Sequence, residues 1–115
     1  MAAFDTLLVE DVIVGSGIAV RKGGALITAH YRGMLTDGSV FDSSYERDQP
    51  FQTVLSRKKV IAAWVDGLLG MQEGGVRRLL VPAVQGYGER GFGDKIPPNA
   101  DLIFEIELLQ VLNRE

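Results

Sequence analysis

The segment that most constrains the fold lies near the end of the chain, at residues 102–108. Apolar side chains occupy every second position, Leu102, Phe104, Ile106 and Leu108, and two of the three positions between them are glutamates. This alternation predicts a strand with one apolar face and one face in contact with water, which is typical of antiparallel sheets. A sheet of this kind needs a second layer to cover its apolar face.

Further strands are indicated by runs of branched and aromatic residues between turn signals. These runs lie at residues 7–14, 25–35, 51–55 and 76–81, and the 14 glycines in 115 residues suit tight turns between strands. Asp37 and Gly38 predict a hairpin that leads into residues 39–41, because both residues tolerate a positive φ.

Only one segment has the periodicity of a helix. Its apolar face consists of Val60, Ile61, Trp64, Val65 and Leu68. Gly67 and Gly70 end the segment quickly, so the helix is short. Because it is the only candidate for the covering layer, the sequence predicts the α+β class, with an antiparallel β-sheet of about five strands wrapped around one short α-helix.

Length and charge limit the organisation and the partners. The 115 residues suffice for one domain, residues 1–115, with a single hydrophobic core. The net charge is −3, and no basic run is longer than Arg57, Lys58 and Lys59, so nucleic acid is not an expected partner. The chain has no cysteine and one histidine, and we therefore expect no disulfide, no metal and no cofactor.

The sequence also lacks the signals of membrane proteins and secreted proteins. No stretch approaches the roughly 18 consecutive apolar residues of a membrane span. The first residues show neither the basic region nor the long apolar region of a secretory signal. We expect a cytoplasmic protein that has no membrane partner.

Two motifs suggest enzyme chemistry but lack the context that it needs. A Ser-His-Asp set would have to use His30, which is better explained as a solvent-facing or hydrogen-bonded side chain of the strand at residues 25–35. Residues 86–91 match the dinucleotide pattern G-x-G-x-x-G. Pro82 interrupts the strand that should precede this pattern, and Pro97 and Pro98 prevent the helix that should follow it, which argues against a nucleotide-binding enzyme.

Aromatic residues gather at junctions between predicted elements. They include Tyr31, Phe41, Phe51, Trp64, Tyr87, Phe92 and Phe104. Most aromatic residues simply fill cores. Trp64, however, is large for the cover of so small a sheet, and several of the others stand where a core would end and a pocket would open.

Several motifs together resemble the FKBP-type peptidyl-prolyl isomerases. They comprise residues 31–38 followed by 41–44, Pro50-Phe51, Val60-Ile61 with Trp64, Tyr87-Gly88, residues 96–100, and residues 102–108. The resemblance extends from about residue 7 to residue 112. It implies a twisted antiparallel sheet around one helix and acceleration of rotation about X-Pro bonds in proline-containing polypeptides, without a cofactor. It also implies binding of rapamycin-like macrolides.

The resemblance further implies the residues of the site. The implied catalytic set is Tyr31, Asp42, Trp64, Tyr87 and Phe104, and the implied substrate-binding set is Phe41, Arg47, Phe51, Val60, Ile61, Phe92 and Ile96. Trp64 would support the proline ring, while the Ile61 backbone N–H and the Tyr87 hydroxyl would donate to ligand carbonyls. Asp42 would accept from Tyr31 and pair with Arg47, which orients the Tyr31 ring.

The chain departs from the family pattern at three positions of one loop. Gln85 stands where many members carry a tyrosine, Phe92 where some carry histidine, and Lys95 where an aliphatic residue is common. These departures bear on substrate preference and macrolide affinity. The chain has no helical arm for dimerisation, so a monomer is expected. A second hypothesis stays open, in which the same pocket serves a proline-loop binding or chaperone module with little turnover.

Overall fold

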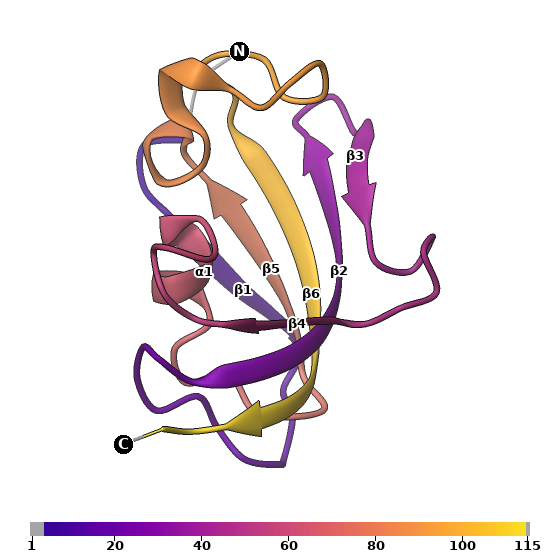
Figure 1. Ribbon diagram of the computed structural model, residues 1–115, viewed down its shortest axis with the longest axis vertical. Coiled ribbons are helices and arrows are strands. Elements are labelled where there is room, and N and C mark those ends of the chain that lie inside the picture. Colours follow the sequence, from indigo (N-terminus) through magenta and orange to yellow (C-terminus); the bar gives the residue numbers. More distant parts are fainter. Residues whose placement is uncertain (1–3, 115) are drawn as a thin grey trace.

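The chain forms one antiparallel sheet that curves around a single short α-helix, as the computed structural model shows for residues 4–114 (Figure 1). The strands are β1 (Leu8–Ile13), β2 (Leu26–Leu35), β3 (Val40–Ser43), β4 (Phe51–Val54), β5 (Val76–Val81) and β6 (Leu102–Leu112). The helix is α1 (Ala62–Gly67), and two 3₁₀ turns follow β5 at Ala83–Gln85 (η1) and Gly88–Arg90 (η2). The predicted α+β class is confirmed.

The sheet has six strands because two short strands share one edge of β2. The strand order is β1-β5-β6-β2-β3, and β4 also pairs with β2. β4 pairs with the first half of β2, from Leu26 to Ala29, and β3 pairs with the second half, from Arg32 to Met34. Residues 44–50 loop out between the two short strands. This arrangement agrees with the predicted sheet of about five strands and with the predicted extended piece at residues 51–55.

The last strand continues beyond the predicted segment. β6 runs to Leu112 and pairs with the whole of β2, and the register shifts where Ala29 faces Leu108 and Thr28 faces Gln110. Leu109 is therefore an extra residue in β6. This bulge reverses the alternation of faces, so burial resumes at Val111 rather than at Gln110.

The apolar face of β6 and the buried face of α1 form the core. Leu102, Ile106 and Leu108 have no exposed surface, and Phe104 is 3% exposed. They share one cluster with Ala63, Trp64 and Leu68 of the helix segment. Burial of each large apolar side chain contributes about 1.5–3 kcal/mol, so the contact between strand and helix holds the two layers together. The prediction that the helix covers the sheet is confirmed.

The last turn of the helix accepts side-chain hydrogen bonds, whereas its first turn has no side-chain cap. Ile61 precedes it in an extended conformation, with φ −63° and ψ 154°, and no side chain caps the first turn. At the other end, Arg77 of β5 donates to the carbonyl oxygens of Gly67 at 3.0 Å and Leu69 at 2.8 Å. Arg77 also pairs with Asp11 of β1 at 2.6 Å. The helix thus begins two residues later than its apolar pattern, and within residues 4–114 no side chain accepts from its first backbone N–H groups.

The hairpin between β2 and β3 differs in detail from the two-residue turn that Asp37 and Gly38 suggested. The loop has three residues, because the Leu35 N–H donates to the Ser39 carbonyl at 2.9 Å. Gly38 alone takes a positive φ, of 91°, while the Asp37 carboxylate accepts from the Ser39 N–H at 2.9 Å. A turn followed by a left-handed glycine is the usual form of a three-residue hairpin.

No helix within residues 4–114 combines the length and the apolar character that crossing a bilayer requires. The G-x-G-x-x-G match also lacks its context here. The 3₁₀ turn η1 precedes it in place of a strand, η2 lies inside the pattern, and residues 92–101 form turns rather than a helix.

Candidate active site

A pocket opens beside the start of α1 on the side of the sheet that holds the helix. Its volume is about 120 Å³, and its lining consists of Tyr31, Phe41, Asp42, Phe51, Lys59, Val60, Ile61, Trp64, Tyr87 and Phe104. A cavity of roughly 150 Å³ holds one benzene molecule. The pocket is therefore of a size to take one small ring.

Trp64 forms the floor of this pocket. Its ring meets Tyr31 at 5.2 Å, Phe104 at 5.7 Å and Phe51 at 5.9 Å between centroids, with interplanar angles of 83°, 87° and 82°. These edge-to-face contacts are the geometry that aromatic pairs prefer. Trp64 is only 3% exposed and belongs to the hydrophobic core, so the floor is rigid.

The walls come from different strands, and one glycine lets two of them meet. Phe41 of β3 and Phe104 of β6 pack at 5.7 Å and 88°. Gly33 of β2 lies beneath them, and a Cβ atom there would stand 2.5 Å from Phe41 Cζ and 2.9 Å from Phe104 Cε1. A side chain at position 33 would therefore displace both rings.

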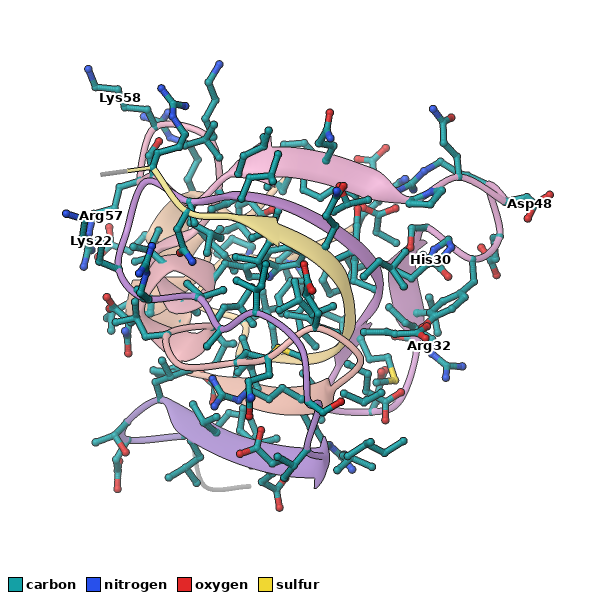
Figure 2. The ribbon with its side chains drawn as sticks, turned by 90° about the horizontal axis from the view of Figure 1, so that it is seen from below. Lys22, His30, Arg32, Asp48, Arg57 and Lys58 are labelled. Atoms are coloured by element: carbon teal, nitrogen blue, oxygen red, sulfur yellow. The ribbon has the colours of Figure 1, made fainter. Side chains whose placement is uncertain are left out.

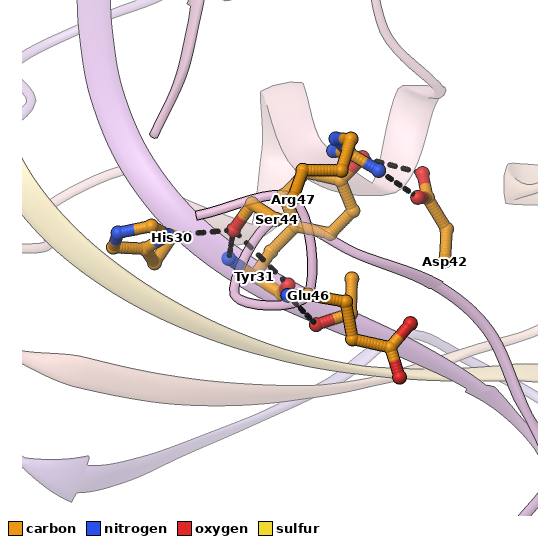
Figure 3. A network of polar contacts seen from close by, with 7 residues as sticks. His30, Tyr31, Asp42, Ser44, Glu46 and Arg47 are labelled. Atoms are coloured by element: carbon orange, nitrogen blue, oxygen red, sulfur yellow. Dashed lines mark hydrogen bonds and ion pairs between the residues drawn. The ribbon is translucent and has the colours of Figure 1, made fainter. Parts of the chain in front are cut away.

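A polar network holds Tyr31 at the edge of the pocket (Figure 3). The Tyr31 hydroxyl donates to Asp42 Oδ2 at 2.5 Å, and Arg47 pairs with the other carboxylate oxygen. Arg47 also donates to the Tyr31 hydroxyl oxygen at 3.1 Å, and its guanidinium lies 5.7 Å from the centroid of the Tyr31 ring. The three side chains therefore form a closed triangle of contacts.

The network shifts the pKa values of its acidic members in opposite directions. Burial and the hydrogen bond to Asp42 raise the pKa of Tyr31. Burial alone would raise the pKa of Asp42, but the hydrogen bonds from Tyr31 and Arg47, with the charge of Arg47, outweigh it and lower that pKa. Asp42 is thus an anion and Tyr31 a neutral donor over the physiological range.

A second set of contacts holds the backbone of Tyr31 from the other side. The Ser44 hydroxyl oxygen accepts from the Tyr31 N–H at 2.7 Å and lies 2.8 Å from His30 Nδ1 (Figure 3). The His30 ring stacks on Tyr45 at 4.6 Å. Ser44 has no exposed surface and therefore cannot serve as a nucleophile. The expectation that His30 is a hydrogen-bonded structural side chain is confirmed.

The rim of the pocket comes from the loop between β5 and β6. Tyr87 and Phe92 lie 5.4 Å apart, and with Phe41, Asp42, Lys95 and Ile96 they line a second hollow of about 100 Å³. Phe92 is 58% exposed, whereas Ile96 is 2% exposed. Phe92 therefore meets solvent at the mouth, and Ile96 lies beneath it. Burial raises the pKa of the Tyr87 hydroxyl.

Two hydrogen-bond donors face the pocket without a partner. Within residues 4–114, no acceptor is found for the Ile61 backbone N–H or for the Tyr87 hydroxyl. Both residues line the pocket, so a ligand with two carbonyl oxygens would satisfy them. Of the twelve residues that the resemblance implied, nine line the pocket. Phe92 and Ile96 lie in the adjoining hollow, and Arg47 reaches the pocket through Tyr31 and Asp42.

Sequence reasoning missed one residue of the lining, Lys59. The run Arg57, Lys58 and Lys59 was considered only as an argument against a nucleic-acid partner. Its position directly before Val60 and Ile61 was the available signal, because a side chain there reaches the same opening.

The fold and the pocket define a class of small domain in which one helix presents an aromatic floor to a ring-shaped ligand. A family model described as FKBP-type peptidyl-prolyl cis-trans isomerase matches residues 19–109. The chain belongs to the FKBP-type peptidyl-prolyl cis-trans isomerases, and it is an isomerase by this membership.

Individual relatives agree with this assignment. The chain is 49% identical over 106 residues to an FK506-binding protein of Neisseria meningitidis serogroup A, which covers 92% of this chain and 96% of that protein. It is 50% identical over 97 residues to the human peptidyl-prolyl cis-trans isomerase FKBP2, covering 84% and 68%. The crystal structure of AtFKBP13 superposes with a TM-score of 0.83 at 39% identity, over 92% of this chain and 93% of that one.

Proposed function

We propose that the pocket above Trp64 binds the proline ring of a polypeptide and accelerates rotation about the X-Pro bond before it. The main support for this proposal is the small pocket with its aromatic floor and with two unpaired hydrogen-bond donors at its edge. The pocket has the size of one five-membered ring, and the donors suit the carbonyl oxygens on either side of that ring.

The proposed mechanism requires no covalent step. Rotation about the peptide bond has a barrier of about 20 kcal/mol and takes tens of seconds or more without a catalyst. At the top of the barrier the amide is twisted and its resonance is lost, so its carbonyl is less polar than in the planar ground state. Transfer from water into an apolar pocket therefore costs less free energy for the twisted amide than for the planar amide. This difference lowers the barrier to rotation.

Each side chain has a defined part in this mechanism. Trp64 supports the ring, and Tyr31, Phe51, Val60 and Phe104 enclose it. Tyr87 and the Ile61 N–H donate to substrate carbonyls, and Phe41, Phe92 and Ile96 hold the carbonyl that precedes proline. Asp42 and Arg47 act through the Tyr31 hydroxyl as positioning residues. Each 1.4 kcal/mol of differential binding gives about a tenfold gain in rate, so no metal, cofactor or general base is needed.

The same pocket is proposed to bind macrolides of the FK506 and rapamycin type. The relatives from Neisseria are named FK506-binding proteins, and their sequences match nearly the whole chain. A macrolide with a proline-like ring and two carbonyls would occupy the floor and pair with the two unpaired donors. We further propose that the chain acts as one domain, as a monomer and in the cytoplasm.

An exchange assay on X-Pro peptides tests the proposal directly. Two-dimensional NMR exchange should show faster cis/trans conversion with the protein than in buffer, and micromolar macrolide should abolish the gain. Equal rates with and without protein would refute the isomerase assignment. Acceleration that macrolide leaves unchanged would refute the assignment of the pocket.

A further inference from the structure

A groove lined by three cations borders the pocket at the start of α1. Its volume is about 490 Å³, and its lining consists of Arg57, Lys58, Lys59, Val60, Ile61, Ala62, Gly86, Tyr87 and Phe92. Four of these residues, Lys59, Val60, Ile61 and Tyr87, also line the pocket. The groove and the pocket are therefore continuous, and a polypeptide with its proline in the pocket has its neighbouring residues within reach of the groove.

The two lysines of this groove differ from Arg57 in their ion pairing within the described part of the chain. Arg57 lies 3.3 Å from both carboxylate oxygens of Asp66, so its charge is balanced within the protein. Across residues 4–114, no carboxylate pairs with Lys58 or Lys59, and the lining of the groove contains no acidic side chain. The whole chain has a net charge of −3, so this local positive charge is opposite in sign to the overall charge.

Most of the other residues that line the groove are apolar. Val60, Ile61 and Ala62 stand beside the lysines, and the exposed ring of Phe92 stands among the other lining residues. Such a surface suits a side chain with a short apolar stem and an anionic end. Figure 2 shows that Lys58 extends away from the ribbon into solvent, where its ammonium group is free to meet an incoming charge.

We propose that this groove is a subsite for an acidic substrate side chain within three residues of the proline. The carboxylate of a glutamate or aspartate would face Lys58 and Lys59, while its stem would lie on Val60 and Ile61. The proposal rests on the isomerase function given above. The phosphoryl group of a phosphoserine shares this chemistry and would use the same subsite, so it forms a separate arm of the test.

A set of proline peptides tests the subsite. Glutamate, glutamine, phosphoserine or lysine is placed at each of the three positions on either side of the proline, and kcat/KM is measured by NMR exchange. Exposed ion pairs change equilibria by roughly 1.5- to fivefold each. We therefore expect one position at which glutamate exceeds glutamine by about two- to fivefold, with lysine below glutamine. The advantage should shrink at 0.5 M salt, roughly, because the Debye length then falls well below 10 Å.

Charge-removal variants assign the preference to the groove. Lys58→Gln with Lys59→Gln should lower the ratio of kcat/KM for the glutamate peptide to kcat/KM for the glutamine peptide to about one. Lys58→Gln alone should lower this ratio while kcat/KM for the glutamine peptide changes little, because Lys58 lines the groove but not the pocket. Arg32→Gln is the matched control, because Arg32 lies on the opposite side of the molecule from Lys58 (Figure 2) and pairs with Glu105. This control should keep the advantage.

The outcomes separate the subsite from the isomerase function. Equal rates for glutamate and glutamine at all six positions, or an advantage that survives the double variant, would overturn the subsite. Turnover of the glutamine peptide would stand in both cases, whereas its absence would refute the isomerase function itself. A gain for phosphoserine without one for glutamate would refute the carboxylate as the ligand and leave a phosphoryl site.

Discussion

The hydroxyl of Tyr31 donates a 2.5 Å hydrogen bond to the carboxylate of Asp42, and both groups lie at the edge of the aromatic pocket. The bond links β2 to β3 beyond their backbone pairing. It directs the Tyr31 proton toward a carboxylate that Arg47 also contacts. The orientation of one pocket wall therefore depends on a charge pair outside the apolar surface.

Removal of the Asp42 carboxylate should lower activity through Tyr31. Hydrogen bonds to charged groups contribute about 1.5–3 kcal/mol, and loss of part of this should lower kcat/KM of Asp42→Ala by about tenfold. Tyr31→Phe, which lacks the hydroxyl, should lose a similar factor. In a double-mutant cycle the combined variant should be little worse than either single one. Fully additive losses would show that Asp42 does not act through Tyr31.

Activity should be independent of pH between about pH 5 and pH 9, because neither Asp42 nor Tyr31 changes charge there. The pKa of Asp42 lies below its ordinary value of 3.8, so its contribution is complete above that value and is lost as the pH falls through the lowered pKa. The pKa of Tyr31 lies above 10.0, so its contribution is complete below that value and is lost as the pH rises further. A bell-shaped profile centred near neutrality would contradict this account.

Trp64→Leu should reduce both catalysis and stability. The floor would lose an aromatic face, and the core would gain a cavity that costs about 2 kcal/mol in the free energy of unfolding. Urea unfolding separates this cost from the loss of kcat/KM in the folded variant. If the affinity for the peptide falls by the same factor as kcat/KM, Trp64 serves both binding and catalysis. If binding falls much further than catalysis, the open hypothesis of a proline-loop binding module gains support.

Gly33→Ala should damage the pocket without touching a polar group. The added methyl would stand within 2.9 Å of Phe104 and closer still to Phe41, and overpacking of this kind costs about 1–3 kcal/mol. Gly23→Ala is the matched control, because its Cβ would find its nearest neighbours at 3.7 Å and 3.8 Å. Macrolide affinity by calorimetry should fall for the first variant and stay unchanged for the second.

Arg77→Met should loosen the end of α1. Two carbonyl oxygens, those of Gly67 and Leu69, would lose their donor, and Asp11 would lose its partner. The Arg77 side chain is only 12% exposed, so we expect a loss of about 2 kcal/mol in thermal or urea unfolding. The exposed Arg90→Met should change stability by less than about 0.5 kcal/mol. Equal effects of the two would contradict the role of Arg77.

Most of the fold was predictable, because strong local patterns produced it. The alternation from Leu102 to Leu108 marked the central strand, and the apolar face around Trp64 marked the helix. The pattern could not reveal the continuation to Leu112, because the bulge at Leu109 reverses the alternation there. Bulges depend on the partner strand, in this case on the position of Ala29, which lies about eighty residues earlier in the sequence.

The site was less predictable from the residues alone. Aromatic residues at element ends suggested a pocket, but the family motifs were needed to select them. Lys59 was missed because a short basic run at a turn usually meets only solvent. It lies in the lining beside Val60 and Ile61, at the start of the helix segment.

Because Trp64 belongs to both the pocket floor and the hydrophobic core, occupancy and folding are thermodynamically linked. A ligand on this ring binds the folded chain alone, since unfolding separates the ring from its neighbours on β2, β4 and β6. At a free concentration one hundred times its dissociation constant, such a ligand adds about 2.7 kcal/mol to the free energy of unfolding. The melting temperature of this protein should consequently rise with ligand concentration, and a pool of proline-containing polypeptides that bind the pocket should stabilise it.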